Sequence, residues 1–149
     1  MTALQKKWRT EMDKALNYLA LARKGGMAAL GEEPVGAAAR ALKAHVVLGA
    51  SDASDHTWRR AKSYVAGTDQ QCIRLAATKE ELGFVVGRQS LAIAAITDVH
   101  MALAMVNSLG QPEKHKAALE ILTQKAQRAR QRQAEARAHQ RNLKKGRKK

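Results

Sequence analysis

The segment AHVVLGASDASDHTWRRAKSYV, residues 44–65, contains the pattern that decides the fold. Its first seven residues form an almost continuous apolar run, which is typical of a strand buried on both faces of a sheet. Ser and Asp residues follow at once, and both types are preferred N-cap residues of helices. The remainder is amphipathic, so the segment predicts a buried strand that leads directly into a capped helix.

The same order of strand, cap and helix recurs along the chain. Further strands are predicted at residues 27–30 (MAAL), 71–77 (QCIRLAA) and 90–96 (SLAIAAI). Thr78 and Glu81 form an S/T-x-x-E capping box, and Thr97 or Asp98 is the expected cap of a helix that ends at Gly110. This alternation predicts an α/β layered domain in which helices cover both faces of four short strands.

Two more helices are predicted in the N-terminal part of the chain. Residues 11–24 carry apolar side chains at helical spacing and end at a pair of glycines. Residues 31–34, GEEP, are expected to begin the second helix. Glu32 and Glu33 would then lie in its first turn, where acidic side chains interact favourably with the positive end of the helix dipole.

Basic residues are concentrated after Gly110. The 149 residues include 27 Lys and Arg against 13 Asp and Glu, a formal net charge of +14, which indicates a polyanionic partner. Residues 1–110 contain 14 basic and 10 acidic side chains, whereas residues 111–149 contain 13 basic and 3 acidic ones. We therefore expect one domain over residues 1–110 and a basic extension over residues 111–149.

The extension is rich in Ala, Gln, Arg and Lys, which favour helices. Its large apolar side chains cluster at Leu119, Ile121 and Leu122, so a helix is expected to dock there for roughly two or three turns. Beyond Lys125 we expect nothing further to be buried. This part is predicted to be a solvated helix, or to be disordered until it meets a partner.

The sequence carries no motif for catalysis or for a cofactor. Its five histidines lack the spacing of metal ligands, and it has no P-loop, G-x-G-x-x-G or G-x-S-x-G motif. Ser51 and Asp52 follow a strand, as catalytic groups often do in α/β enzymes, but helix capping is the simpler role for both. Cys72 is expected to be a small buried apolar residue. We expect no enzyme activity, no metal, no cofactor and no small-molecule substrate.

Cysteine content and the N-terminal sequence favour a cytoplasmic protein. The single cysteine rules out an internal disulfide, and the first residues lack the apolar core of a signal peptide. No stretch is long and apolar enough to suggest contact with a membrane. Aromatic residues make up 3% of the chain, which disfavours stacking of nucleic-acid bases on an aromatic platform.

Two segments resemble a known family of RNA-binding proteins. They are LNYLALARKGGMAALGEEPVGAAARALKAHVVLGASDAS at residues 16–54 and ATKEELGFVVGRQSLAIAAITD at residues 77–98. Together they resemble, over residues 13–109, the bacterial branch of the seven-Ae and thirty-e superfamily of large-subunit ribosomal proteins. The resemblance implies a three-layer α-β-α sandwich with a short four-stranded mixed sheet. It also implies binding to structured RNA, ribosomal RNA or kink-turns among them, and makes the ribosome a candidate partner.

The resemblance also implies which residues contact RNA. The family's G-x-N-E-x-x-K turn corresponds to Gly31, Glu32 and Glu33 and the residues after them, and Lys79 lies close by in the family fold. The loop before the last strand supplies four more candidates: Gly87, Arg88, Gln89 and Ser90. A sequence-neutral basic arm would add five arginines of the extension: Arg128, Arg130, Arg132, Arg137 and Arg141.

This sequence departs from the family turn at three positions. Glu33 replaces the Asn, Pro34 the Glu and Ala37 the Lys. A carboxylate accepts hydrogen bonds from the N–H groups of guanine but lacks the donor of an amide, and Ala37 removes a charge-assisted contact. Recognition of RNA shape and backbone tolerates such changes.

Four other interpretations remain open. The same fold could serve as a protein-interaction module, which would require an acidic or apolar binding face. It could be an accessory domain of an RNA-modifying enzyme, whose cofactor domain would then be on a partner chain. Residues 111–149 alone could coat nucleic acid without any site on the body, or could merely keep the protein soluble.

Overall fold

A four-stranded mixed sheet lies at the centre of the computed structural model, which describes residues 2–147. The strands lie in the order β1-β4-β2-β3; β2 pairs parallel to β3 and antiparallel to β4, which is also antiparallel to β1. Their bounds are Ala28–Leu30 for β1, Val46–Gly49 for β2, Gln71–Arg74 for β3 and Ile93–Ile96 for β4. The predicted mixed sheet of four short strands is confirmed.

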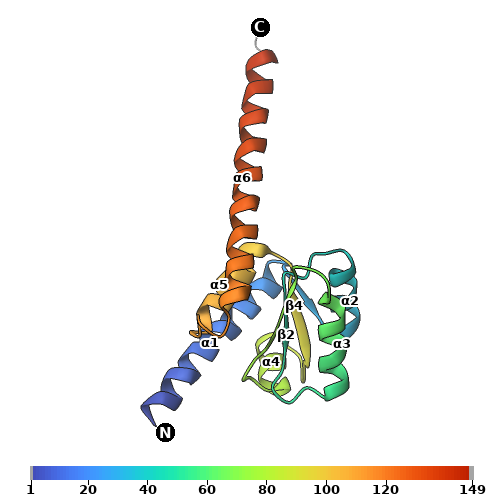
Figure 1. Cartoon of the computed structure of the whole chain (residues 1–149), viewed down its shortest axis with the longest axis vertical. Helices are drawn as coiled ribbons and strands as arrows, with labels where there is room; N and C mark the ends of the chain where they lie inside the picture. The colour runs from blue at the N-terminus through green and yellow to red at the C-terminus, as the bar shows by residue number, and fades with distance from the viewer. Residues whose placement is uncertain (1, 148–149) are drawn as a thin grey trace.

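Helices cover both faces of the sheet, which confirms the three-layer sandwich (Figure 1). The helices on one face are α2 (Glu32–Arg40) and α3 (Asp55–Val65). Those on the other are α1 (Ala3–Lys24), α4 (Lys79–Val85), α5 (Val99–Ser108) and α6 (Lys116–Arg147). The long helix α6 runs beside α5 and then continues well beyond the body.

The two central strands are buried on both faces, as their continuous apolar runs predict. Successive side chains of a strand point to opposite faces, so Val46 and Leu48 join the core under α1 and α5, while Val47 joins the core under α2 and α3. On β4, Ala94 joins the core under α1 and α5, and Ala95 joins the core under α2 and α3. The sheet therefore needs apolar residues at every position of these strands.

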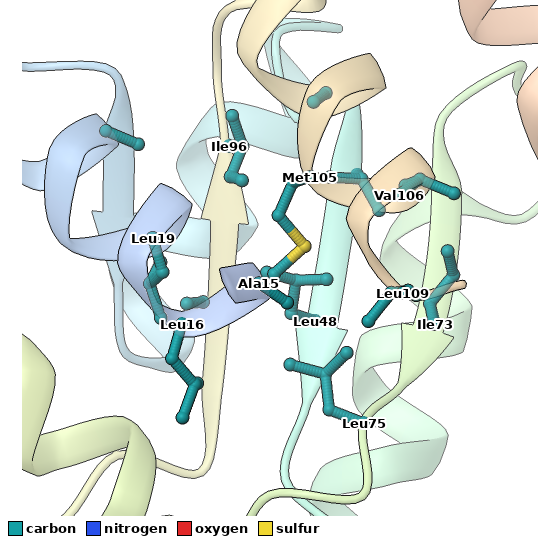
Figure 2. Close-up of a cluster of buried hydrophobic side chains, with 14 of the residues drawn as sticks. Ala15, Leu16, Leu19, Leu48, Ile73, Leu75, Ile96, Met105, Val106 and Leu109 are labelled. Carbon is teal, nitrogen blue, oxygen red and sulfur yellow. The ribbon is translucent and has the colours of Figure 1, made fainter. Parts of the chain in front are cut away.

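The larger core is aliphatic and lies between α1, α5 and the sheet (Figure 2). Met105 extends from α5 toward Leu48 of the sheet and Ala15 of α1. All three residues are completely buried. Close packing is possible because the α1 residue at this point is alanine, which leaves room for the flexible methionine side chain.

The predicted helix caps are present. Ser54 accepts a hydrogen bond from the amide of Thr57 at the start of α3, and Asp98 accepts one from the amide of Met101 at the start of α5. Thr78 and Glu81 form the expected capping box of α4. Local sequence thus sets where these three helices begin.

Two helices differ from their predicted extents. Helix α1 begins at Ala3 rather than near residue 11, because Thr2 and Gln5 form a capping box that adds two turns and more to its start. In α6, burial does not stop at Lys125 as predicted: Ala126 is 2% exposed and Ala129 packs partly against the core. The prediction was wrong because it considered only large apolar side chains.

Candidate nucleic-acid interface

Four loops meet at one edge of the sheet, which we call the loop edge. Strand β4 is antiparallel to β1 and β2, and β3 is parallel to β2, so the start of β4 lies beside the ends of the other three strands. The loop edge consists of residues 31–34, 50–54, 75–79 and 87–91. Both parts of the predicted RNA face, the turn at Gly31 and the loop at Gly87, are among them.

Gly31 and Arg88 lie next to each other at this edge. Gly31 precedes α2 with a φ of 95°, a conformation that favours glycine, and its amide donates to the carbonyl of Ile93 at 3.0 Å. A Cβ atom placed on Gly31 would lie 3.8 Å from Nη1 of Arg88. The structure thus brings together two predicted site residues that are far apart in sequence.

The loop of residues 87–90 is exposed but held in place by its backbone. The amide of Arg88 donates to the carbonyl of Gly83 at 2.8 Å, and the loop crosses α4 so closely that a Cβ on Gly83 would lie 2.7 Å from the Arg88 carbonyl oxygen. Leu91, only 3% exposed, anchors the end of the loop in the core. Arg88, Gln89 and Ser90 therefore project from a fixed support.

Lys79 begins α4, and its backbone hydrogen-bonds to two neighbouring loops of the loop edge. Its amide donates to Oδ1 of Asp52 at 2.8 Å, and its carbonyl accepts from the amide of Leu91 at 2.9 Å. The capping role predicted for Asp52 is thus confirmed at α4, where it supplements the cap by Thr78. The side chain of Ser51 caps no helix among residues 2–147, and α3 is capped by Ser54 instead. Lys79 is half-buried and its backbone lies beside the loop of residues 87–91.

The two glutamates at the start of α2 have different surroundings. Glu32 accepts hydrogen bonds from Oγ1 of Thr57 at 3.0 Å and from Nη1 of Arg60 at 3.3 Å, so its side chain joins α2 to α3. Glu33 is exposed and has no hydrogen-bond or ion-pair partner among residues 2–147. Its carboxylate is therefore available to a ligand, whereas that of Glu32 is already engaged.

Arg74, which no sequence motif marks, supports the loop after β2. Arg74 donates to the carbonyls of Ala53 at 2.9 Å and Ala50 at 3.4 Å. Its guanidinium also lies 5.4 Å from the centroid of the Trp58 ring, which covers Gly49. Arg74 thus holds the loop that carries Asp52 in place, a role that the neighbouring sequence does not predict.

The predicted basic arm lies away from the loop edge. In Figure 1, α6 leaves the body on the side opposite to α4 and the loops beside it. Five arginines are exposed along it: Arg128, Arg130, Arg132, Arg137 and Arg141.

The opposite edge, which we call the tail edge, consists of residues 43–45, 68–70 and 97–99. The two edges are separated by the length of the strands, about 13 Å for four residues.

Cys72 on β3 is a free cysteine. Burial raises the pKa of the Cys72 thiol to about 11, so this thiol is protonated and unreactive at neutral pH. Within residues 2–147, no group of three His, Cys, Asp or Glu side chains could hold a metal ion. None of the helices described is both long and apolar enough to cross a lipid bilayer.

Two solved structures are similar in fold to this chain. A Bacillus halodurans protein of unknown function matches with a TM-score of 0.61 at 21% identity, over 65% of this chain and 97% of that one. A 15.5 kDa RNA-binding protein of Giardia lamblia matches with a TM-score of 0.57 at 15% identity, over 70% of this chain and 88% of that one. The chain has the fold of these two proteins. No family model and no curated protein matches its sequence.

Proposed function

We propose that this protein binds structured RNA at the loop edge and performs no reaction. The observation that carries the proposal is the convergence of Arg88 on Gly31 at the uncapped start of α2. Among the described residues, the Arg88 guanidinium has no hydrogen-bond or ion-pair partner. A fixed loop that presents a free guanidinium beside a helix N-terminus is suited to an RNA backbone.

The start of α2 adds backbone donors to this site. Gly31 offers no side chain to cap the helix, so the amides of Glu32 and Glu33 are free of a side-chain partner. Pro34 has no amide hydrogen, and that of Val35 already donates to the Gly31 carbonyl at 3.0 Å. Two backbone donors and one guanidinium can thus bind the same phosphate or neighbouring phosphates.

The specific form of the proposal is recognition of a kink-turn. The exposed carboxylate of Glu33 would accept hydrogen bonds from the N–H groups of a guanine that a sharp bend displays, and Arg88 would bind the adjoining backbone. The structural likeness to an RNA-binding protein of Giardia lamblia supports RNA as the ligand class. Because α6 leaves from the tail edge, the same RNA must extend past the body if it is also to contact the basic arm.

A titration of the full chain tests this proposal. A kink-turn RNA is compared with the same RNA whose tandem G·A pairs are replaced by Watson–Crick pairs, at near-physiological salt because binding by the basic arm depends on salt. The variant is Arg88→Gln. Its matched control is Arg23→Gln, which removes the same charge from the exposed end of α1.

We expect the wild type to prefer the kinked RNA by about tenfold or more. Arg88→Gln should weaken binding of this RNA by about 1–3 kcal/mol, or roughly 5- to 150-fold, while Arg23→Gln changes it about twofold or less. Equal affinity for the two RNAs would contradict kink-turn recognition. Equal effects of the two variants would show that the loop edge is not the site.

One observation favours a protein partner instead. Phe84 on α4 is 85% exposed, beside a surface groove that Leu16, Val85 and Arg9 help to line. An exposed aromatic ring next to a partly apolar groove is common at protein interfaces. If the protein is an interaction module, the RNA titration fails in all variants, and Phe84→Ser abolishes capture of the partner without changing stability.

A further inference from the structure

A basic cavity lies at the tail edge, under the base of α6. Its volume is about 450 Å³. Three residues of the body line it: His45 just before β2, Asp69 before β3 and Val99 at the start of α5. Helix α6 closes its other side with four residues: Lys125, Arg128, Ala129 and Arg132.

Positive charge predominates in this cavity. Lys125 is largely buried, with 14% of its side chain exposed, and its Nζ lies 3.3 Å from Oδ1 of Asp69, which is 58% exposed. Arg128 and Arg132 face the cavity without an acidic partner among residues 2–147; Nε of Arg132 donates to the Arg128 carbonyl at 3.4 Å. Three cations thus surround one carboxylate, which leaves two guanidiniums to bind an anion.

His45 brings an imidazole ring to the lining of the cavity. Its Nδ1 atom is buried and has no hydrogen-bond partner among the residues that the structure describes. Buried polar atoms in folded proteins almost always have a partner. Burial lowers the pKa of the ring, and the charge of Lys125 lowers it further, against smaller opposite effects of Asp69 and Asp98. The ring is therefore neutral at neutral pH, and because it lines the cavity, its signals can report what the cavity holds.

We propose that this cavity binds one phosphate group of the RNA backbone. The inference rests on the proposed function, because it supplies a second contact for the same RNA at the opposite edge of the sheet. Arg128 and Arg132 lie one turn apart on α6, so both guanidiniums can reach one phosphate and satisfy its oxygens in a bidentate manner. Lys125 and His45 complete the site from its two sides.

The site divides the five tail arginines into two classes. Arg128 and Arg132 line the cavity, whereas Arg130 is exposed on another side of the same helix and Arg137 lies beyond it. A featureless electrostatic arm would use all of them alike, since only total charge matters for counterion release. A phosphate site in the cavity makes Arg128 and Arg132 more important for RNA binding than Arg130 and Arg137. Double variants of these two pairs remove the same charge and can therefore be compared directly.

The experiment records the imidazole NMR signals of His45 in the full chain at about pH 7. Inorganic phosphate replaces chloride at constant ionic strength, and kink-turn RNA is added in a separate series. The test variant is Arg128→Gln/Arg132→Gln; the control, Arg130→Gln/Arg137→Gln, removes the same charge from the same helix. We expect phosphate and RNA each to shift the His45 signals saturably in the wild type and the control, but not in the test variant.

RNA affinity completes the test. The test variant should bind the kink-turn RNA at least about tenfold more weakly than the control variant, corresponding to about 1.4 kcal/mol. If His45 does not respond, or the two double variants behave alike, the site is absent, and the proposed function still stands wherever Arg88→Gln weakens binding. If free phosphate shifts His45 but RNA does not, the assignment to RNA backbone is overturned.

Discussion

At the scale of single residues, Gly83 decides whether the candidate site can form. The sequence T-K-E-E-L-G places this glycine in α4, where its hydrogen leaves room for the loop that carries Arg88. Neither the helix pattern nor the capping box of α4 requires a glycine there. The requirement comes from the neighbouring backbone, which approaches closer than any side chain would allow.

Replacing Gly83 by alanine is predicted to destabilise the protein and displace the loop. The added Cβ would lie 2.8 Å from the Ser90 amide nitrogen, and backbone cannot move aside as a flexible side chain can. We expect a loss of about 1–3 kcal/mol in the free energy of unfolding, measured with urea. Gly146→Ala is the control: it lies in exposed helix with open space around it and should be neutral or slightly stabilising.

His45 makes stability depend on pH. Its pKa is lowered in the folded state, chiefly by burial, so below about pH 6.5 the unfolded chain binds more protons than the folded one. Stability is therefore full above this pH and falls as the pH drops toward 5. His115, whose pKa is also lowered by burial, acts in the same direction. In urea unfolding, His45→Gln should reduce the loss between pH 7 and 5; a slope identical to wild type would refute the assignment.

At the scale of elements, α6 is both part of the core and part of the surface. Ala118, Leu122 and Ala126, spaced by one turn, are buried against the body, and the helix then continues exposed. Small alanines do not stand out in a sequence so rich in them, which is why burial beyond Lys125 went unpredicted. A chain cut after Gly110 would uncover this part of the core, so RNA-binding tests need the full chain.

Leu122→Ala is predicted to weaken the attachment of α6. Leu122 is fully buried, so its truncation leaves a cavity and should cost about 2–5 kcal/mol. Ile121 directly precedes Leu122 and is only partly buried, so Ile121→Ala should lower the free energy of unfolding clearly less. Urea unfolding followed by circular dichroism measures both variants. Equal costs would mean that α6 does not pack against the body as described.

At the scale of the whole molecule, strand order and the position of α6 decide where the proposed RNA contacts lie. The strands, caps and helices can be predicted from local pattern. Burial on both faces shows as a continuous apolar run, and N-capping depends on residues within one helical turn. The order β1-β4-β2-β3 depends on contacts between distant segments, and local pattern does not specify it. The family resemblance implies that Gly31 and Arg88 belong to one RNA face, and the folded sheet places them next to each other. The cavity at His45 requires the packing of α6, and no sequence motif marks it.

The same topology places the two proposed RNA contacts at opposite edges of the sheet. In our proposal the loop edge recognises the shape of the RNA, and the tail edge binds the continuation of the same backbone. An RNA that contacts both must pass across about 13 Å of strand length and then follow α6. Site choice and salt-dependent affinity would thus reside in different parts of one molecule.

The most direct test of this account is an NMR footprint of kink-turn RNA on the full-length protein, recorded as backbone amide shifts at near-physiological salt. We predict that the amides of residues 31–33 and 87–90 shift together and saturate with the RNA, alongside changes in α6. Shifts confined to residues 125–147, with residues 31–33 and 87–90 unmoved, would contradict it: RNA would then bind the basic helix alone.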